Sequence, residues 1–99
     1  MEAVIASFGD KTTGDIYHGR LTKAARKISP DLWERIQSKL DLMNAALTLE
    51  DLRVPPSNHL EKLRGEWKGY YSIRVNQQHR LVFRFADGAC NDVRCVDYH

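Results

Sequence analysis

The chain has 99 residues, which is enough for one domain but not for two separate hydrophobic cores. Hydrophobic residues make up 42% of the sequence and charged residues 28%, a balance that is typical of a soluble globular protein and excludes a disordered chain. Its apolar runs are far shorter than the roughly 20 residues of a transmembrane helix. We therefore expect a single domain over residues 1–99 with no membrane partner.

The positive charge is distributed unevenly along the chain. The formal net charge is only +2, which excludes a protein that coats nucleic acid by electrostatics alone. Residues 1–58 are neutral overall, whereas residues 67–86 carry no acidic side chain and four basic ones, namely Lys68, Arg74, Arg80 and Arg84. This basic stretch is therefore the expected binding region for an anionic ligand.

The first half of the chain has the patterns of a short strand followed by helices. Residues 3–8 have the apolar content of a strand, and the near-helical spacing of residues 13–27 predicts one or two short helices. Ser29, Pro30 and Asp31 indicate a helix start, with the Ser29 hydroxyl as the cap. The helix should run to about residue 46, and its apolar face comprises Trp33, Ile36, Leu40, Met43 and Leu47. Residues 48–52 predict a further turn.

The second half of the chain changes from helical to alternating spacing of apolar residues. Residues 60–63, 71–76, 80–85 and 91–96 predict strands, and Asp87-Gly88 is a strong hairpin-turn signal. Helices followed by hairpin-linked strands indicate an α+β domain, with the helices packed on one face of a mostly antiparallel, twisted sheet. The alternation places Arg74, Arg80 and Arg84 on the face without helices, where they would form a concave basic surface.

The sequence gives no support for a metal or a cofactor. The four histidines match no zinc spacing, and neither a phosphate-binding glycine loop nor a serine-hydrolase motif is present. Cys90 and Cys95 are an odd number of residues apart in one predicted strand, so we expect them on opposite faces as buried, unbonded thiols. With only two cysteines and no visible export signal, we expect a cytoplasmic protein.

The basic stretch and the last three residues suit metal-free cleavage of RNA. In this reaction the 2′-hydroxyl attacks the adjacent phosphate, and arginine can stabilise the charge that develops there. Asp97, Tyr98 and His99 can transfer or orient protons, and the apolar strand before them would attach them to the sheet. Tyr98 could stack on unpaired bases, as could Trp67 and Tyr70, for which partial burial beside the glycine turns is an equal alternative.

Five stretches of the chain occur in an order and spacing that is specific when taken together. They are DLRVPPSN at 51–58, LEKLRG at 60–65, GYYSIRVN at 69–76, HRLVF at 79–83 and VDYH at 96–99. These stretches resemble the HigB toxins, which belong to the RelE/ParE superfamily of bacterial type II toxin–antitoxin systems, and the N-terminal half fits more loosely. The resemblance implies a compact RelE-like fold and an mRNA endonuclease that depends on the ribosome and cuts codons in its A site.

The resemblance also implies binding partners and residue roles. The partners would be a HigA-like helix-turn-helix antitoxin, the ribosome and mRNA, with operator DNA contacted only through the antitoxin. Arg80 would bind the scissile phosphate, and Asp97, Tyr98 and His99 would form the functional C-terminal tail. The expected RNA-binding residues are Lys62, Lys68, Arg74, Asn76 and Arg84. For Arg74 and Asn76 the alternative is that they support the sheet.

Three positions depart from the pattern of the HigB toxins. Arg64 stands where several of these toxins have a catalytic lysine, and an arginine can stabilise charge but cannot give up a proton near neutral pH. Glu61 aligns near a histidine of some relatives, and His79 replaces a tryptophan that often precedes the phosphate-binding arginine. Two alternatives to the nuclease therefore stay open. One is a module that binds RNA or the ribosome without cutting, and the other is a protein that mainly binds the antitoxin and modulates operon repression.

Overall fold

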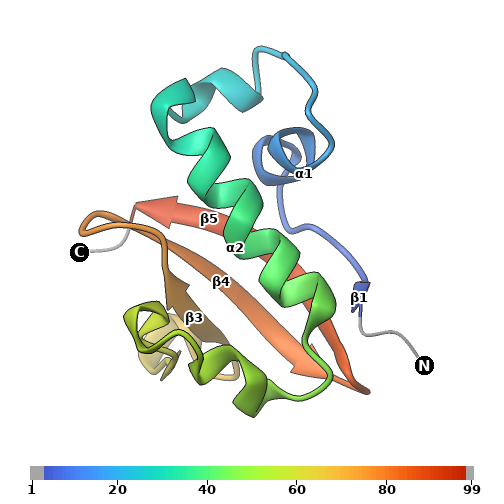
Figure 1. Ribbon diagram of the computed structural model, residues 1–99, viewed down its shortest axis with the longest axis vertical. Coiled ribbons are helices and arrows are strands. Elements are labelled where there is room, and N and C mark those ends of the chain that lie inside the picture. Colours follow the sequence, from blue (N-terminus) through green and yellow to red (C-terminus); the bar gives the residue numbers. More distant parts are fainter. Residues whose placement is uncertain (1–3, 98–99) are drawn as a thin grey trace.

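The computed structural model describes residues 4–97, which form a five-stranded sheet with two α-helices on one face (Figure 1). The strand order is β1-β5-β4-β3-β2. The first strand pairs with β5 in parallel, and every other pairing is antiparallel. The strands are β1 (Val4–Ile5), β2 (Glu61–Lys62), β3 (Tyr71–Arg74), β4 (His79–Ala86) and β5 (Ala89–Asp97). The predicted α+β class, with a mostly antiparallel sheet, is confirmed.

The helices occur where the spacing predicted them, but their ends differ. The α-helices are α1 (Lys11–Tyr17) and α2 (Trp33–Ala45), and the 3-10 turns are η1 (Ala25–Lys27), η2 (Pro30–Leu32), η3 (Leu49–Arg53), η4 (Pro56–Asn58) and η5 (Gly65–Trp67). The Ser29 hydroxyl makes no capping bond, so that prediction is wrong, and α2 follows directly from η2. Leu47 is 62% exposed instead of continuing the apolar face, because the chain leaves the helix at Ala46.

The strands also differ from their predicted bounds. The first strand covers only Val4–Ile5, and a single parallel bridge then joins Phe8 to Val93. Strand β5 is longer than predicted because it begins directly after the turn at Asp87 and Gly88. Both turn residues have positive φ angles, of 53° and 75°, as a tight turn of this hairpin type requires.

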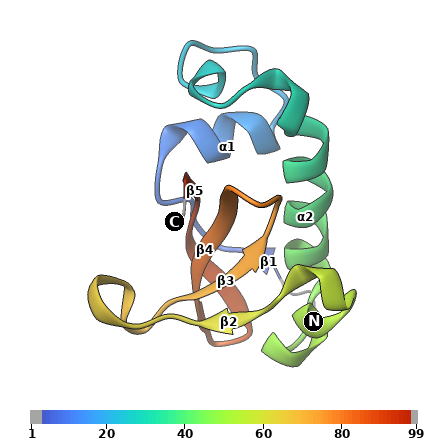
Figure 2. The same ribbon diagram turned by 90° about the vertical axis from the view of Figure 1, so that its left-hand side faces the viewer.

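The main core lies between the helices and one face of the sheet, and Figure 2 shows α2 standing to one side of the strands. Ile36, Leu40 and Met43 of α2 are fully buried, together with Leu81 and Phe83 of β4. Each such side chain contributes on the order of 1.5–3 kcal/mol by burial. The apolar face predicted for α2 is therefore the face that holds this helix on the sheet.

A β-bulge in β5 changes which side chains share a face. Val82 pairs with Arg94 and Arg84 pairs with Asn91, so β5 has one additional residue, and Asp92 there has a positive φ of 57°. The extra residue shifts the alternation, and Cys90 and Cys95 both lie in the core on the helix-covered face. The prediction of opposite faces is wrong. The thiols are free and buried, and burial raises the pKa of each to about 12.

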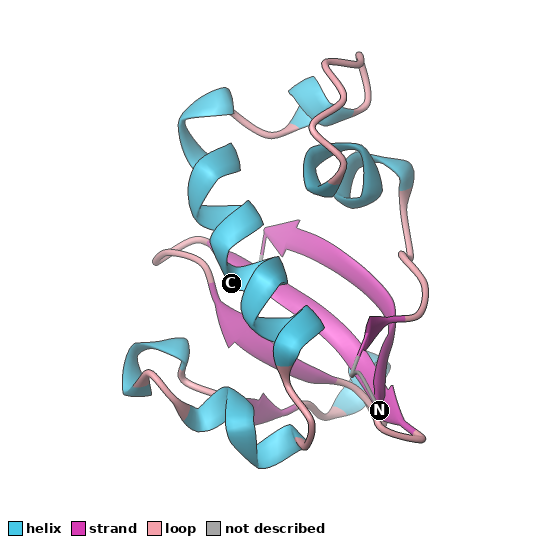
Figure 3. Cartoon of the chain, turned by 45° about the vertical axis from the view of Figure 1, so that its right-hand side comes forward, coloured by secondary structure: helices cyan, strands magenta, loops and turns pink. Residues whose placement is uncertain are grey.

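The sheet face without helices is covered around Arg80. Ser72 and Val82, which alternate with the core residues of β3 and β4, are fully buried, and so is most of Arg80. Strand β2 continues the sheet beyond β3 (Figure 3), and the His59 carbonyl and the Glu61 side chain contact Arg80 from this edge. The predicted concave basic surface is therefore wrong for Arg80. It holds only for Arg84, which is exposed, and in part for Arg74, which is half-buried.

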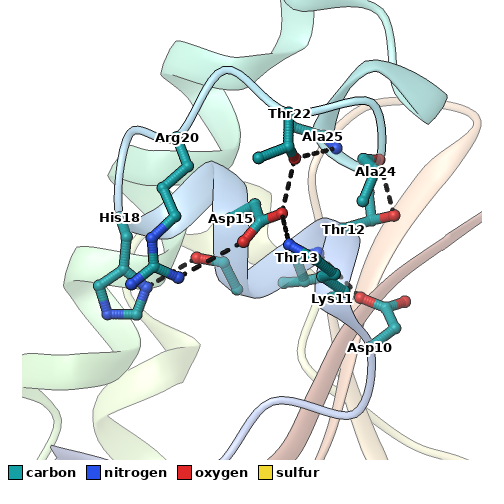
Figure 4. Close-up of polar contacts among 11 residues, drawn as sticks. Asp10, Lys11, Thr12, Thr13, Asp15, His18, Arg20, Thr22, Ala24 and Ala25 are labelled. Atoms are coloured by element: carbon teal, nitrogen blue, oxygen red, sulfur yellow. Dashed lines mark hydrogen bonds and ion pairs between the residues drawn. The ribbon is translucent and has the colours of Figure 1, made fainter.

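A buried carboxylate attaches α1 to the loop that follows it (Figure 4). Asp15 is only 2% exposed, and its oxygens accept from Lys11 Nζ at 2.6 Å, Thr22 Oγ1 at 2.6 Å and Arg20 Nη1 at 3.4 Å. The hydrogen bonds from Lys11 and Thr22 are the main reason that the pKa of Asp15 is lowered to about 2. We call these four residues the Asp15 cluster.

Residues 4–97 contain neither a membrane-spanning helix nor a cluster of metal-binding side chains. No helix in this range has the length and apolar character to cross a membrane. The same residues hold no group of three or more His, Cys, Asp or Glu side chains that could bind a metal ion.

Candidate functional site

Arg80 is the most buried of the predicted site residues that the structure describes, with 8% of its surface exposed. Its Nη1 donates to Ser72 Oγ at 2.8 Å and to the His59 carbonyl at 3.2 Å, and its Nη2 lies 2.6 Å from Glu61 Oε1. Glu61 and Ser72 are direct partners in the β2–β3 ladder, so the sheet register places both beside Arg80. The guanidinium is thus held in place from three sides, and one of these partners is the Glu61 carboxylate, whose side chain is 53% exposed.

The loop before β2 is built to present the His59 carbonyl to Arg80. Asn58 is fully buried, and its amide donates to the carbonyls of Leu52 at 3.0 Å and Val54 at 3.3 Å. The Asn58 Oδ1 accepts from Lys39 Nζ of α2 at 2.5 Å, which ties this loop to the helix. His59 then takes a left-handed conformation with φ of 44°, which is uncommon for a residue other than glycine and is often found at functional sites.

Three further predicted residues surround one surface hollow of about 350 Å³. Lys62, Arg64 and Lys68 line it, and all three are exposed. The chain turns between them at Gly65, where φ is 65°, so that η5 brings Lys68 back toward Arg64. Arg80 does not line this hollow, because its contacts are on the face where Glu61 lies. The structure therefore separates the predicted site into at least two groups of cations.

A second surface hollow, of about 380 Å³, lies between α2 and the end of β3. Its basic lining residues are Arg35, Lys39, His59 and Arg74, and we call it the α2–β3 hollow. Burial, followed by the nearby charge of Arg35, lowers the pKa of Lys39 below its ordinary value. Of these four residues only Arg74 was predicted to bind RNA. The signal for the others was weak, because two cations four residues apart on a helix are usual on a solvated surface.

Asn76 has a structural role in the β3–β4 turn. Its Oδ1 accepts from the backbone N–H of Gln78 at 2.8 Å and of His79 at 2.6 Å. An asparagine that bonds the backbone two and three residues ahead closes a turn. These contacts favour sheet support over RNA binding, the two alternatives that the sequence left open.

Trp67 and Tyr70 are half-buried and contact each other edge to face, with ring centroids 5.1 Å apart. Arg84 lies over the Tyr70 ring at 6.0 Å, and Arg94 lies over the Trp67 ring at 5.8 Å. The Tyr70 hydroxyl donates to Asp92, and the Arg94 guanidinium contacts the same carboxylate at 2.8 Å. The hydrogen bond from the Tyr70 hydroxyl is the main reason that the pKa of Asp92 is lowered, and the contact with Arg94 adds to this effect. Of the two alternatives for Trp67 and Tyr70, stacking on bases or partial burial, the structure supports partial burial. The sequence did not indicate that Arg94 would lie beside Trp67.

Asp97 lies apart from Arg80. It pairs with His79 at the end of β5, whereas Arg80 pairs with Val96, and neighbouring residues of a strand point to opposite faces. Its carboxylate accepts from Gln78 Nε2 at 3.0 Å and lines a hollow beside α1 together with Asp10 and Thr12. The described structure thus does not bring Asp97 and Arg80 to one face. Tyr98 and His99, the other predicted members of the tail, lie outside the described residues.

Comparison with solved structures shows which proteins share this fold. The YoeB–YefM complex from Staphylococcus aureus has a chain with a TM-score of 0.57 and 24% identity, and the alignment covers 98% of this chain and 99% of that one. YafQ from Escherichia coli strain BL21(DE3) has a TM-score of 0.54 and 16% identity, with 94% and 92% covered. The helices on a mostly antiparallel sheet are thus the RelE-like toxin fold.

Comparison of the sequence identifies the family. The family model described as the RelE-like toxin of the type II toxin–antitoxin system HigB matches residues 6–99. Toxin HigB-1 of Vibrio cholerae serotype O1 is 41% identical over 81 residues, which are 82% of this chain and 83% of that protein. The chain belongs to the HigB-like toxin family, and it is a toxin of a type II toxin–antitoxin system.

Proposed function

We propose that this toxin is a ribosome-dependent endoribonuclease that cuts mRNA in the A site without a metal ion and thereby inhibits translation. The observation that carries the proposal is the buried Arg80 guanidinium, positioned by Ser72 and the His59 carbonyl while its accessible partner is a carboxylate. A phosphate has the charge and the oxygen geometry to take the place of the Glu61 carboxylate on Arg80. Arg80 would then stabilise the charge that develops on the scissile phosphate.

The remaining predicted residues take roles that their chemistry allows. The 2′-hydroxyl loses its proton as its oxygen bonds to phosphorus, and the bond to the 5′-oxygen breaks as that oxygen gains a proton. The products are a 2′,3′-cyclic phosphate and a 5′-hydroxyl. We assign the proton transfers to the tail of Asp97, Tyr98 and His99. Arg64, with Lys62 and Lys68 around the same hollow, supplies positive charge to the RNA strand and transfers no proton.

The proposed partners follow from the family. We propose a HigA-like helix-turn-helix antitoxin that neutralises the toxin and contacts operator DNA, so that the toxin reaches this DNA only through its partner. The YoeB chain of the compared structure is described in a complex with YefM, which supports an antitoxin partner of some kind for this fold. Action on translating ribosomes would place the protein in the cytoplasm.

The decisive experiment is a translation reaction with purified toxin and mapping of the 5′ ends of the message. Wild-type protein should give new ends at A-site codons only when ribosomes are present. Arg80→Ala should lower the cleavage rate by about 100-fold or more, the usual loss when one preorganised charge-stabilising donor is removed. Arg80→Lys keeps a positive charge but loses the planar pair of donors, so we expect it to remain strongly impaired.

The matched control is Arg26→Ala, because Arg26 is an exposed arginine of η1 that has no ion pair among the described residues. Circular dichroism and thermal melting would confirm that each variant is folded. Cleavage by a folded Arg80→Ala protein at the wild-type rate would contradict the proposal.

A non-catalytic binding module is the second candidate, and two features favour it. Glu61 already neutralises Arg80 at 2.6 Å, and Arg64 replaces the lysine of several relatives. A protein with these features could hold RNA, the ribosome or the antitoxin without cutting. Folded wild-type protein that binds ribosomes but yields no new 5′ ends would establish this alternative.

A further inference from the structure

The α2–β3 hollow concentrates positive charge that the protein does not neutralise. Arg35 and Lys39 are one helical turn apart on α2, and Arg74 approaches from β3. Within residues 4–97, none of these three cations has an ion-pair partner, and no acidic residue lines the hollow. Like charges one turn apart destabilise a helix by a few tenths of a kcal/mol, so a bound anion would relieve an existing repulsion.

The other lining residues provide donors of the kind that oxygen anions need. Ser57 and Gln77 carry polar side chains at the rim, and the His59 side chain lies in the same lining. Lys39 is half-buried in this lining, and this burial lowers its pKa. An anion there would interact more strongly with these cations than it would on an open surface.

The hollow adjoins the Arg80 site in two ways. Arg74 is the direct partner of Arg80 in the β3–β4 ladder, so both side chains are on the same face of the sheet. His59 belongs to both places, since its carbonyl accepts from Arg80 and its residue lines the hollow. A nucleic acid strand that has one phosphate at Arg80 would therefore pass close to the α2–β3 hollow.

We propose that the α2–β3 hollow binds a second phosphodiester of RNA, distinct from the one at Arg80, and thereby fixes the direction of the strand across the sheet. The inference rests on the proposed function only in taking RNA as the ligand. The phosphodiester belongs either to the message or to ribosomal RNA. These two sources share the same chemistry and are distinguished by experiment.

The test compares two charge reversals that change the net charge equally. Arg35→Glu puts a carboxylate in the hollow, one turn before Lys39, in the order that favours a helical ion pair. Arg26→Glu makes the same change on the exposed surface of η1. Binding is measured with two probes at several salt concentrations. One probe is a single-stranded RNA oligonucleotide with 2′-O-methyl riboses, which cannot be cleaved by 2′-hydroxyl attack, and the other is vacant ribosomes.

We expect Arg35→Glu to weaken binding of at least one probe by about 10-fold or more, and to lower the slope of log affinity against log salt by about one. Arg26→Glu should change both affinities much less. Selective loss on the oligonucleotide assigns the phosphodiester to the message, and selective loss on vacant ribosomes assigns it to ribosomal RNA. Arg35→Gln, which only removes the charge, should give a smaller loss in the same direction, and melting curves should show all variants folded.

Two results would overturn the inference. Equal weakening by the two reversals on both probes would mean that only net charge matters. Displacement of the oligonucleotide by polyglutamate as effectively as by RNA would mean that the hollow takes carboxylates, as in a protein partner. Neither result depends on cleavage. If wild-type protein binds RNA through Arg35 but never cuts it, only the nuclease proposal is wrong. If wild-type protein cuts RNA while Arg35→Glu binds both probes as Arg26→Glu does, only the inference about the α2–β3 hollow is wrong.

Discussion

The Asp15 cluster and the α2–β3 hollow are both groups of charged side chains, but only the first contains charges of both signs. Asp15 is buried, and Lys11, Arg20 and Thr22 surround its carboxylate (Figure 4). Arg35 and Arg74 line the hollow, and no acidic residue belongs to its lining. A charge cluster that contributes to folding thus carries its own counterion. A cluster that lacks one is where a ligand of opposite charge is expected.

Arg80 falls between these two cases. It is buried like Asp15, and both buried groups have exposed counterions: the side chain of Glu61 is 53% exposed, and those of Lys11 and Arg20 are 69% and 59% exposed. A buried charge with an accessible partner can exchange that partner for a ligand at little cost in packing. Because the buried group is a cation at Arg80 and an anion at Asp15, only Arg80 can exchange its counterion for a phosphate, and we assign a structural role to Asp15.

The largest effect on stability should come from Asp15→Asn. The amide that replaces the carboxylate removes the charge that Lys11 and Arg20 pair with, and it leaves buried donors such as the Thr22 hydroxyl with a poorer acceptor. We expect the melting temperature to fall by several degrees. Asp41→Asn is the control, because Asp41 is exposed on α2, and its melting temperature should stay within a degree or so of wild type. An equal fall in both variants would remove the distinction between the clusters.

The loss of stability caused by Asp15→Asn should become smaller in acid, over a defined range of pH. The pKa of Asp15 is lowered from 3.8 to about 2, so the carboxylate stabilises the fold fully above its ordinary pKa, and this contribution is lost as the pH falls toward 2. The difference in unfolding free energy between wild type and Asp15→Asn should therefore be constant near neutral pH and shrink between about pH 4 and pH 2. Denaturant titrations over this range would measure it, and a difference that persists at pH 2 would contradict the assignment.

The smallest effect distinguishes single arginines of the two regions. Arg20→Gln removes a partner of Asp15 and should lower the unfolding free energy by a few tenths of a kcal/mol, as is usual for an exposed ion pair. Arg35→Gln removes a like charge beside Lys39 and should leave stability unchanged or slightly higher. In the same variant the pKa of Lys39 should rise, which an NMR titration of its side chain can follow. A loss of stability in Arg35→Gln as large as in Arg20→Gln would mean that the hollow is structural.

The secondary structure could be predicted well because its signals are local. Alternation along 71–76 and 80–85, the Asp87-Gly88 turn, and the three- and four-residue steps of α2 each act within a few residues. The prediction of which side chains share a face failed where one extra residue altered the alternation of a strand. The extra residue at Asp92 reversed the alternation of β5 and put Cys90 and Cys95 on one face. A bulge leaves no clear mark when the residue in the left-handed conformation is an aspartate.

The sequence by itself determined the class of fold, the family and the identity of the basic residues, since these depend on residue types and their order. Only the tertiary structure decided how each charge is used. Glu61 and Ser72 reach Arg80 because β2 pairs with β3 in one register, and Arg35 and Arg74 line one hollow because the packed helix α2 lies beside the end of β3. Such neighbours are separated by many residues along the chain. Whether a charge is neutralised or left to bind a ligand is therefore decided when the helices and strands pack, and the local pattern cannot show it.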